Sequence, residues 1–163
     1  AFNKSRCLNL HPGNPPYLLR FAEIVPSKFT NLKSLIITKS LLRRINLQPI
    51  TLKKELDGFV FNRLQGALLR EAYSLVDQEV ISSNDIDLIV KKGLGLRWSV
   101  IGPFETIDLN TKGGIENHSK IMVPFYKRIF ANKKKSNLFE FNTRLKRIDL
   151  YETRVECILR SYN

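Results

Sequence analysis

The sequence is poor in the residues from which metal centres and disulfide frameworks are built. Its 163 residues include two cysteines, Cys7 and Cys157, and two histidines, His11 and His118. The cysteines stand far apart, without the close spacing that is typical of zinc ligands or of small disulfide-stabilised domains. We therefore expect no metal site, and we expect both thiols to stay reduced.

Long apolar runs are also lacking. Lys, Arg or Asn interrupts each apolar stretch well before the ~18 residues that a membrane-spanning helix needs. No basic segment followed by an apolar one opens the chain, as it would in a secretory signal. Apolar residues still make up 43% of the sequence, which is enough for a packed core. We expect a cytoplasmic protein without a membrane partner.

A glycine-rich phosphate-binding loop is the third absence. The nearest stretch is Gly93-Leu94-Gly95-Leu96-Arg97-Trp98, which has Trp98 at the place of the third glycine. It also follows a helical pattern, whereas a dinucleotide-binding loop follows a strand. No structural start signal precedes the predicted strand at residues 6–10. We therefore expect that a further segment belongs before residue 1.

Positive charge is concentrated at the two ends of the chain. The formal net charge of +12 divides into +7 over residues 1–57, −2 over residues 58–119 and +7 over residues 120–163. The cluster Lys133-Lys134-Lys135 lacks the regular alternation with aromatic residues that a surface for stacking nucleic-acid bases would have. Because charge runs are usually solvated, we do not expect a nucleic-acid partner. A basic nucleic-acid-binding module stays open as an alternative.

Hydrophobic periodicity predicts an α/β segment at the start of the chain. Residues 6–10 and 21–26 fit short strands, and residues 48–53 fit a third strand. Between the second and third of these strands, residues 30–45 fit an amphipathic helix with Thr30 or Asn31 as its N-cap.

Helical patterns follow the turn at Asp57-Gly58. The longest covers residues 59–78, and its apolar residues occupy much of its circumference, which predicts a central helix. Asn62 lies near its start, in a segment otherwise suited to burial, and buried amides need hydrogen-bond partners. The other predicted helices are a short one capped by Ser82 or Ser83 that stops at Gly93, one that begins at Pro103 and ends at Gly113-Gly114, and one at residues 121–130.

His11 and Glu23 are the candidate pair for proton chemistry. His11 stands where a predicted strand ends, and Glu23 lies in the next predicted strand. A carboxylate beside a neutral imidazole fixes one of its tautomers. The open alternatives are a histidine bound by backbone and water, and a glutamate at the surface. His118, in a polar stretch after Gly113-Gly114, is expected at the surface.

Three motifs resemble those of the 3-hydroxyacyl-CoA dehydrogenase family. His11-Pro12-Gly13-Asn14-Pro15 with Glu23 resembles the family's His-x-x-Asn-Pro turn and its glutamate partner, and residues 58–64 resemble its Gly-Phe-x-x-Asn-Arg segment. Gly93-Leu94-Gly95 and Gly102-Pro103-Phe104-Glu105 are similar to its later signatures. Residues 96–110 look closest to the lambda-crystallin branch, which includes L-gulonate 3-dehydrogenase.

The resemblance implies a fold as well as a family. Residues 1–57 are expected to be the last part of a Rossmann-type NAD-binding domain, an α/β remnant. Residues 58–130 are expected to form an all-α domain that binds substrate and dimerises, so that the chain is mostly helical. Residues 131–163 are expected to be a basic tail of uncertain structure.

The resemblance also implies an activity, the NAD-dependent oxidation of the 3-hydroxyl of an acyl-CoA or of a small hydroxy acid such as L-gulonate. His11 would be the general base and Glu23 its partner. Asn62 would hydrogen-bond the reacting oxygen, and Asn14 would help to position the substrate. A homodimer is implied too. A non-catalytic, crystallin-like structural protein is the alternative.

The chain departs from the family in its cofactor-binding half. The family's glycine-rich loop and an active-site serine come before the histidine turn, and neither is found in this sequence. We expect the chain to be a truncated product or a partial reading frame that neither binds NAD nor acts alone. The cofactor-binding residues are therefore unknown.

Overall fold

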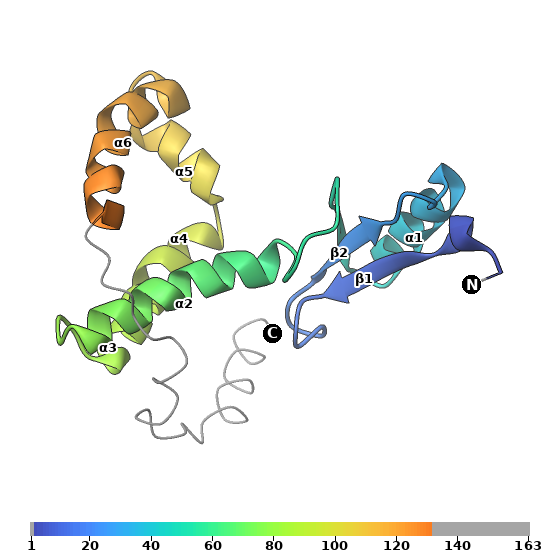
Figure 1. Cartoon of the computed structure of the whole chain (residues 1–163), viewed down its shortest axis with the longest axis horizontal. Coiled ribbons are helices and arrows are strands. Elements are labelled where there is room, and N and C mark those ends of the chain that lie inside the picture. The colour runs from blue at the N-terminus through green and yellow to red at the C-terminus, as the bar shows by residue number, and fades with distance from the viewer. Residues whose placement is uncertain (1, 132–163) are drawn as a thin grey trace. The chain divides into compact units, whose positions relative to one another are not determined.

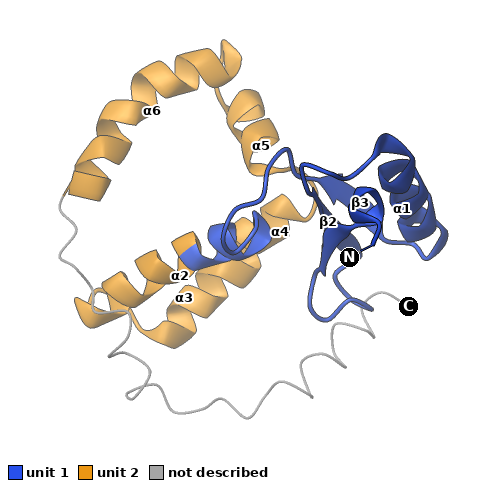
Figure 2. Cartoon of the chain, turned by 45° about the vertical axis from the view of Figure 1, so that its right-hand side comes forward, with its two compact units in different colours: residues 1–66, 147–163 blue, residues 67–146 orange. Residues whose placement is uncertain are grey.

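The computed structural model describes residues 2–131, which fall into two compact units. Unit 1 comprises the described residues up to Gly66, and unit 2 begins at Ala67 (Figure 2). The predicted basic tail, apart from Ala131, lies outside the described residues.

Unit 1 contains a three-stranded sheet in the order β1-β2-β3. Figure 1 labels β1 and β2, and Figure 2 labels β2 and β3. Strand β1 (Leu8–Pro12) is antiparallel to β2 (Phe21–Pro26), and β2 is parallel to β3 (Gln48–Thr51). Helix α1 (Leu32–Arg44) connects the two parallel strands, because such strands need a crossover. The predicted order of elements is confirmed.

The N-terminal boundary of the sheet differs from the prediction. Residues 4–6 form a short 3₁₀-helix, η1 (Lys4–Arg6), so β1 begins at Leu8 and not at residue 6. The predicted cap of α1 is confirmed as Asn31, whose side chain accepts a hydrogen bond from the backbone N–H of Ser34 at 2.7 Å.

The central strand β2 separates two differently covered faces of the sheet. Ala22 and Ile24 are fully buried and pack in one cluster with Leu42 of α1 and with Leu47. Since side chains alternate along a strand, Glu23 lies on the opposite face. A buried carboxylate therefore lies on the face away from α1.

The predicted all-α segment is confirmed. Helix α2 begins in unit 1 and continues into unit 2. None of the described helices is long and apolar enough to cross a bilayer. The helical elements are α2 (Phe61–Asp77), α3 (Ser83–Ile89), the π-helical turn η2 (Val90–Leu94), α4 (Gly95–Trp98), α5 (Pro103–Asn110) and α6 (Gly114–Ala131).

Helix α2 was predicted to be enclosed by other helices, but most of its residues are exposed. Ser74 is its one buried residue, and Leu64 is 65% exposed. Its apolar residues occupy much of its circumference, which predicted packing on several sides. In the structure these residues are exposed or half-buried. The prediction of a central helix is therefore wrong for the described part of the chain.

The helical run after Ser82 does not stop at Gly93. The side chain of Ser82 caps α3 by accepting from the N–H of Asp85, as predicted, but the backbone continues through η2 into α4. The N–H of Gly95 donates to the carbonyl of Val90, the wide spacing of a π turn. A Cβ on Gly95 would lie 2.9 Å from that oxygen, whereas Gly93 has open space.

Helix α6 begins earlier than predicted. Its first residue is Gly114 and not Ile121, because the carboxylate of Asp108 in the preceding helix accepts from the N–H of Ile115 at 3.2 Å. The predicted start of α5 at Pro103 is confirmed, and Glu105 accepts from the N–H of Gly102 at 2.6 Å.

The π turn predicts opposite effects for two neighbouring glycines. Gly93→Ala should raise the free energy of unfolding by about 0.5–1 kcal/mol, the advantage of alanine over glycine in a helix. Gly95→Ala should lower it, because the added methyl group meets the Val90 carbonyl. Urea denaturation followed by circular dichroism measures both changes. An equal stabilisation by both substitutions would contradict the widened turn.

Candidate functional site

The structure brings His11 and Glu23 together across the β1–β2 pair. The two residues are direct register partners, and His11 Nδ1 lies 2.8 Å from Glu23 Oε2. The side chain of Glu23 is 2% exposed and that of His11 is 26% exposed. The alternative of a surface glutamate is thereby excluded, and the imidazole keeps one part open to a ligand.

The second oxygen of Glu23 binds the start of helix α2. Glu23 Oε1 accepts from the backbone N–H groups of Val60, at 2.9 Å, and of Phe61, at 3.1 Å. Val60, just before the first helical residue, has no side chain that can cap a helix. Glu23 therefore supplies the acceptor from a distant strand and joins the sheet to α2.

This contact was not predicted, although the sequence carries a signal for it. The helical pattern in the sequence begins at residue 59, and the helix in the structure begins at Phe61. Neither residue is directly preceded by Ser, Thr, Asp or Asn. The first N–H groups of a helix need acceptors. A helix start without a local cap predicts an acceptor elsewhere in the chain.

The hydrogen bonds of Glu23 select the tautomer of His11. An ionised carboxylate can only accept, so in a neutral imidazole Nδ1 carries the proton and Nε2 has a free lone pair. The pair can therefore hold a neutral imidazole whose Nε2 accepts a proton from a bound molecule.

Phe59 is a second residue at the site that was not predicted. Its ring stacks on the imidazole of His11, with the ring centroids 4.7 Å apart and the planes at 28°. The turn that carries it has positive φ angles at Gly58 (76°) and Phe59 (50°). These backbone angles cannot be read from a hydrophobic pattern.

An apolar cavity of about 480 Å³ adjoins Glu23 within unit 1. Its volume is in the range of small-molecule sites. Thr51 Oγ1 is buried at its wall without a hydrogen-bond partner among the described residues. The lining residues are Phe21, Glu23, Ile50, Thr51, Leu52, Lys53, Lys54, Leu56, Val60, Phe61 and Leu64.

The two asparagines implied as substrate ligands do not bind the His11–Glu23 pair. Asn62 is in the first turn of α2, next to Phe61, and its side chain is exposed, so the expected buried amide is wrong. Asn14 is exposed in the turn after β1. Within the described residues, neither amide hydrogen-bonds to His11 or Glu23.

His118 was predicted to lie at the surface, and the structure exposes it only in part. It is half-buried in unit 2, with Nδ1 3.2 Å from Thr111 Oγ1 and its ring centroid 6.2 Å from that of Tyr126. Its Nε2 is buried and has no partner among the described residues. The early start of α6 at Gly114 places this residue inside the helix and against Thr111.

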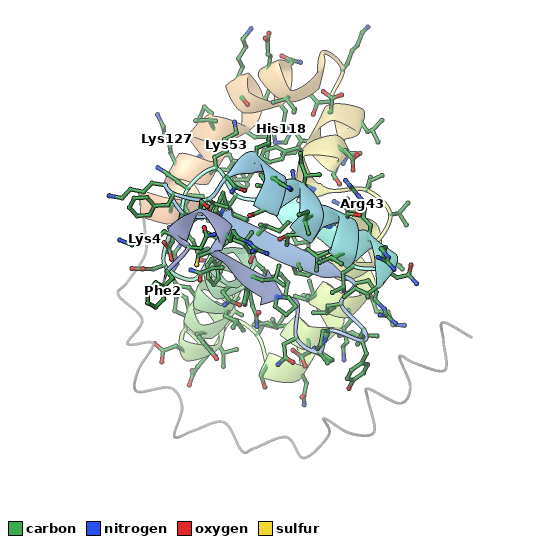
Figure 3. All side chains as sticks on the ribbon, turned by 90° about the vertical axis from the view of Figure 1, so that its right-hand side faces the viewer. Phe2, Lys4, Arg43, Lys53, His118 and Lys127 are labelled. Carbon is green, nitrogen blue, oxygen red and sulfur yellow. The ribbon has the colours of Figure 1, made fainter. Side chains whose placement is uncertain are left out.

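The described residues contain no group of three or more His, Cys, Asp or Glu that could hold a metal ion. Among the described residues of unit 1, Lys4, Arg43 and Lys53 are exposed basic residues from three different parts of the chain. Figure 3 labels Lys4 of η1, Arg43 of α1 and Lys53 after β3.

The three hydrogen bonds of Glu23 predict a large difference between two substitutions. Glu23→Leu leaves the donors at His11, Val60 and Phe61 unpaired. At about 1–3 kcal/mol for each of the two backbone N–H groups, it should lower the free energy of unfolding by about 2–6 kcal/mol. Glu23→Gln keeps one acceptor oxygen and should cost about 1 kcal/mol.

Urea denaturation measures these changes. The matched control is Glu55→Gln, because Glu55 accepts one hydrogen bond, from Asn9, at the surface. It should leave the free energy of unfolding nearly unchanged. A loss for Glu23→Leu no larger than that of the control would contradict the assigned hydrogen bonds.

Two protein-family models match the chain. Residues 1–56 match the 3-hydroxyacyl-CoA dehydrogenase NAD binding domain, and residues 58–144 match the 3-hydroxyacyl-CoA dehydrogenase C-terminal domain. These matches confirm the predicted fold class, an α/β fragment of a Rossmann-type domain followed by a helical domain.

Individual relatives agree with these models. Lambda-crystallin of Oryctolagus cuniculus is 44% identical over 108 residues, which cover 66% of this chain and 34% of the relative. A 3-hydroxyacyl-CoA dehydrogenase of Gibberella moniliformis is 41% identical over 120 residues, 74% of this chain and 37% of the relative. The chain thus spans about a third of the length of these relatives.

Solved structures show the same fold. The structure of a 5-formyl-3-hydroxy-2-methylpyridine 4-carboxylic acid 5-dehydrogenase, described as an NAD⁺-dependent dismutase, is 28% identical with a TM-score of 0.68, over 93% of this chain and 45% of that one. The resemblance seen in the motifs is confirmed, and the chain belongs to the 3-hydroxyacyl-CoA dehydrogenase family.

Proposed function

We propose that unit 1 carries the proton-transfer half of an NAD-dependent dehydrogenase site, with His11 as general base and Glu23 as its partner. The observation that carries the proposal is the 2.8 Å contact between His11 Nδ1 and a carboxylate that is 2% exposed. A general base needs an unprotonated atom within reach of the substrate proton. His11 Nε2 is that atom, and Glu23 stabilises the imidazolium that forms.

The reaction is the oxidation of a secondary alcohol to a ketone. The hydroxyl proton passes to His11 Nε2, and the carbonyl bond forms as the carbon loses a hydride. NAD supplies the acceptor for that hydride in dehydrogenases of this kind. The residues of this chain handle the proton.

The described residues do not fit the phosphates of NAD. A dinucleotide site uses a glycine-rich turn between a strand and the open N-terminus of a helix. The turn from β2 to α1 in this chain is Ser27-Lys28-Phe29-Thr30, and the side chain of Asn31 already occupies the N–H of Ser34. We propose that the chain neither binds NAD nor turns over alone.

The substrate class follows from the family. We propose a 3-hydroxyacyl-CoA or a small 3-hydroxy acid such as L-gulonate, with Asn62 and Asn14 as hydrogen-bonding residues. Similar proteins are named 3-hydroxyacyl-CoA dehydrogenase and L-carnitine dehydrogenase. The exposed amide of Asn62 is free to reach a ligand beside the cap formed by Glu23.

Association into a homodimer through the helical domain at residues 58–130 belongs to the same proposal. Its described helices expose large apolar side chains, among them Phe104 at 73% and Leu109 at 71%. Exposed apolar surface of this kind favours association. The alternative of a non-catalytic, crystallin-like protein is supported by the names of the relatives alone.

The proposal predicts activity once a nucleotide-binding segment is supplied. In a chimera, the residues that precede the matched region in the 5-formyl-3-hydroxy-2-methylpyridine 4-carboxylate 5-dehydrogenase of Mesorhizobium japonicum would be joined to residues 1–163 of this chain. NADH formation is then measured with 3-hydroxybutyryl-CoA and with L-gulonate. His11→Ala should lower kcat/KM by roughly 10²–10⁴-fold, the usual loss for a general base.

Two comparisons make this experiment decisive. His118→Ala, the matched histidine variant, should leave kcat/KM of the chimera unchanged. A His11→Ala chimera as active as the parent chimera would refute the role of His11. Calorimetric titration of the unfused chain with NADH should give no saturable binding. Micromolar binding of NADH by the unfused chain would contradict the proposal that it does not bind NAD alone.

A further inference from the structure

The ring of Phe59 covers one face of the His11 imidazole. The centroids lie 4.7 Å apart and the planes meet at 28°, a stacked arrangement. Glu23 holds the same imidazole by a single hydrogen bond at Nδ1. One hydrogen bond leaves the ring free to tilt about the line that joins the two atoms, and a stacked ring removes this freedom.

The backbone at Phe59 indicates that the residue is present for its side chain. Its φ angle is 50°, in the left-handed region that favours glycine and asparagine. It follows Gly58, whose φ is 76°, and its N–H donates to the carbonyl of Leu56 at 3.1 Å. A bulky residue in this conformation persists where the surroundings hold it, and such positions cluster at functional sites.

Residues 59–61 contact both members of the pair. The ring of Phe59 stacks on His11, and the N–H groups of Val60 and Phe61 bind Glu23. A single turn of the chain thus restrains the imidazole and the carboxylate together. All of these contacts lie within unit 1.

We propose that Phe59 is a positioning residue for His11, holding the imidazole so that its Nε2 edge keeps one direction. The proposal rests on the proposed function in one respect, that His11 is the base. The Phe59 ring covers one face of the imidazole and Glu23 occupies Nδ1, so Nε2 is left as the atom that meets a substrate.

The first test uses this chain alone and needs no activity. Phe59→Gly removes the ring and suits the positive φ, so the turn is expected to keep its conformation. Proton NMR should then show the ring protons of His11 moving downfield, because the shielding by the Phe59 ring is lost. In Phe59→Tyr they should stay near their original positions, because the aromatic face is restored.

Two controls belong to this test. The ring protons of His118, which lies near Tyr126 in unit 2, should not move in any variant. Phe29→Leu removes a half-exposed ring near Lys4 and Lys28 and should leave the His11 signals unchanged. Unchanged His11 signals in Phe59→Gly would overturn the proposal.

The second test measures catalysis in the chimera described above. Phe59→Gly should lower kcat by up to roughly 10²-fold, the effect of misplacing a reacting group, with KM nearly unchanged, and Phe59→Tyr should restore kcat. Shifted His11 signals with unchanged kcat would overturn the positioning role. An inactive parent chimera would overturn the proposed function, and the NMR result would still decide whether Phe59 orients the imidazole.

Discussion

The carboxylate of Glu23 is the constraint on which the rest of unit 1 depends. It is buried in the central strand of the sheet and accepts hydrogen bonds from His11, Val60 and Phe61. Burying a charge is costly unless hydrogen bonds satisfy it. These three donors make the burial possible. The carboxylate in turn fixes the tautomer of His11 and caps the start of α2. One side chain therefore stabilises the fold and orients the imidazole.

This arrangement explains why the site is built at a junction between strands and a helix. The register of β1 and β2 sets the distance between His11 and Glu23, and the turn at Gly58 and Phe59 delivers the helix start to the same carboxylate. A change in any of these elements alters the others. His11 and Glu23 are thus held in place by main-chain geometry.

The sequence predicted the parts of this design that depend on local signals. Two neighbouring predicted strands suggested that His11 and Glu23 could pair, and side-chain chemistry narrowed each helix cap to two residues, of which Asn31 and Ser82 are the caps in the structure. It did not predict contacts that join distant segments, such as Glu23 with Val60. Nor did it predict that a π turn carries the helix through Gly93, which a local pattern indicated as a stop. These features depend on tertiary contacts and on backbone geometry.

The tautomer of His11 depends on the carboxylate of Glu23, which accepts at Nδ1. ¹⁵N NMR of the imidazole, at a pH where it is neutral, tests this most directly. In the unaltered chain we expect a protonated Nδ1 and an unprotonated Nε2. In Glu23→Gln, the amide oxygen would accept from Val60 and Phe61 while its NH₂ group donates to Nδ1, so the tautomer should reverse. A protonated Nε2 in the unaltered chain, or the same tautomer in both proteins, would show that Glu23 does not select the tautomer.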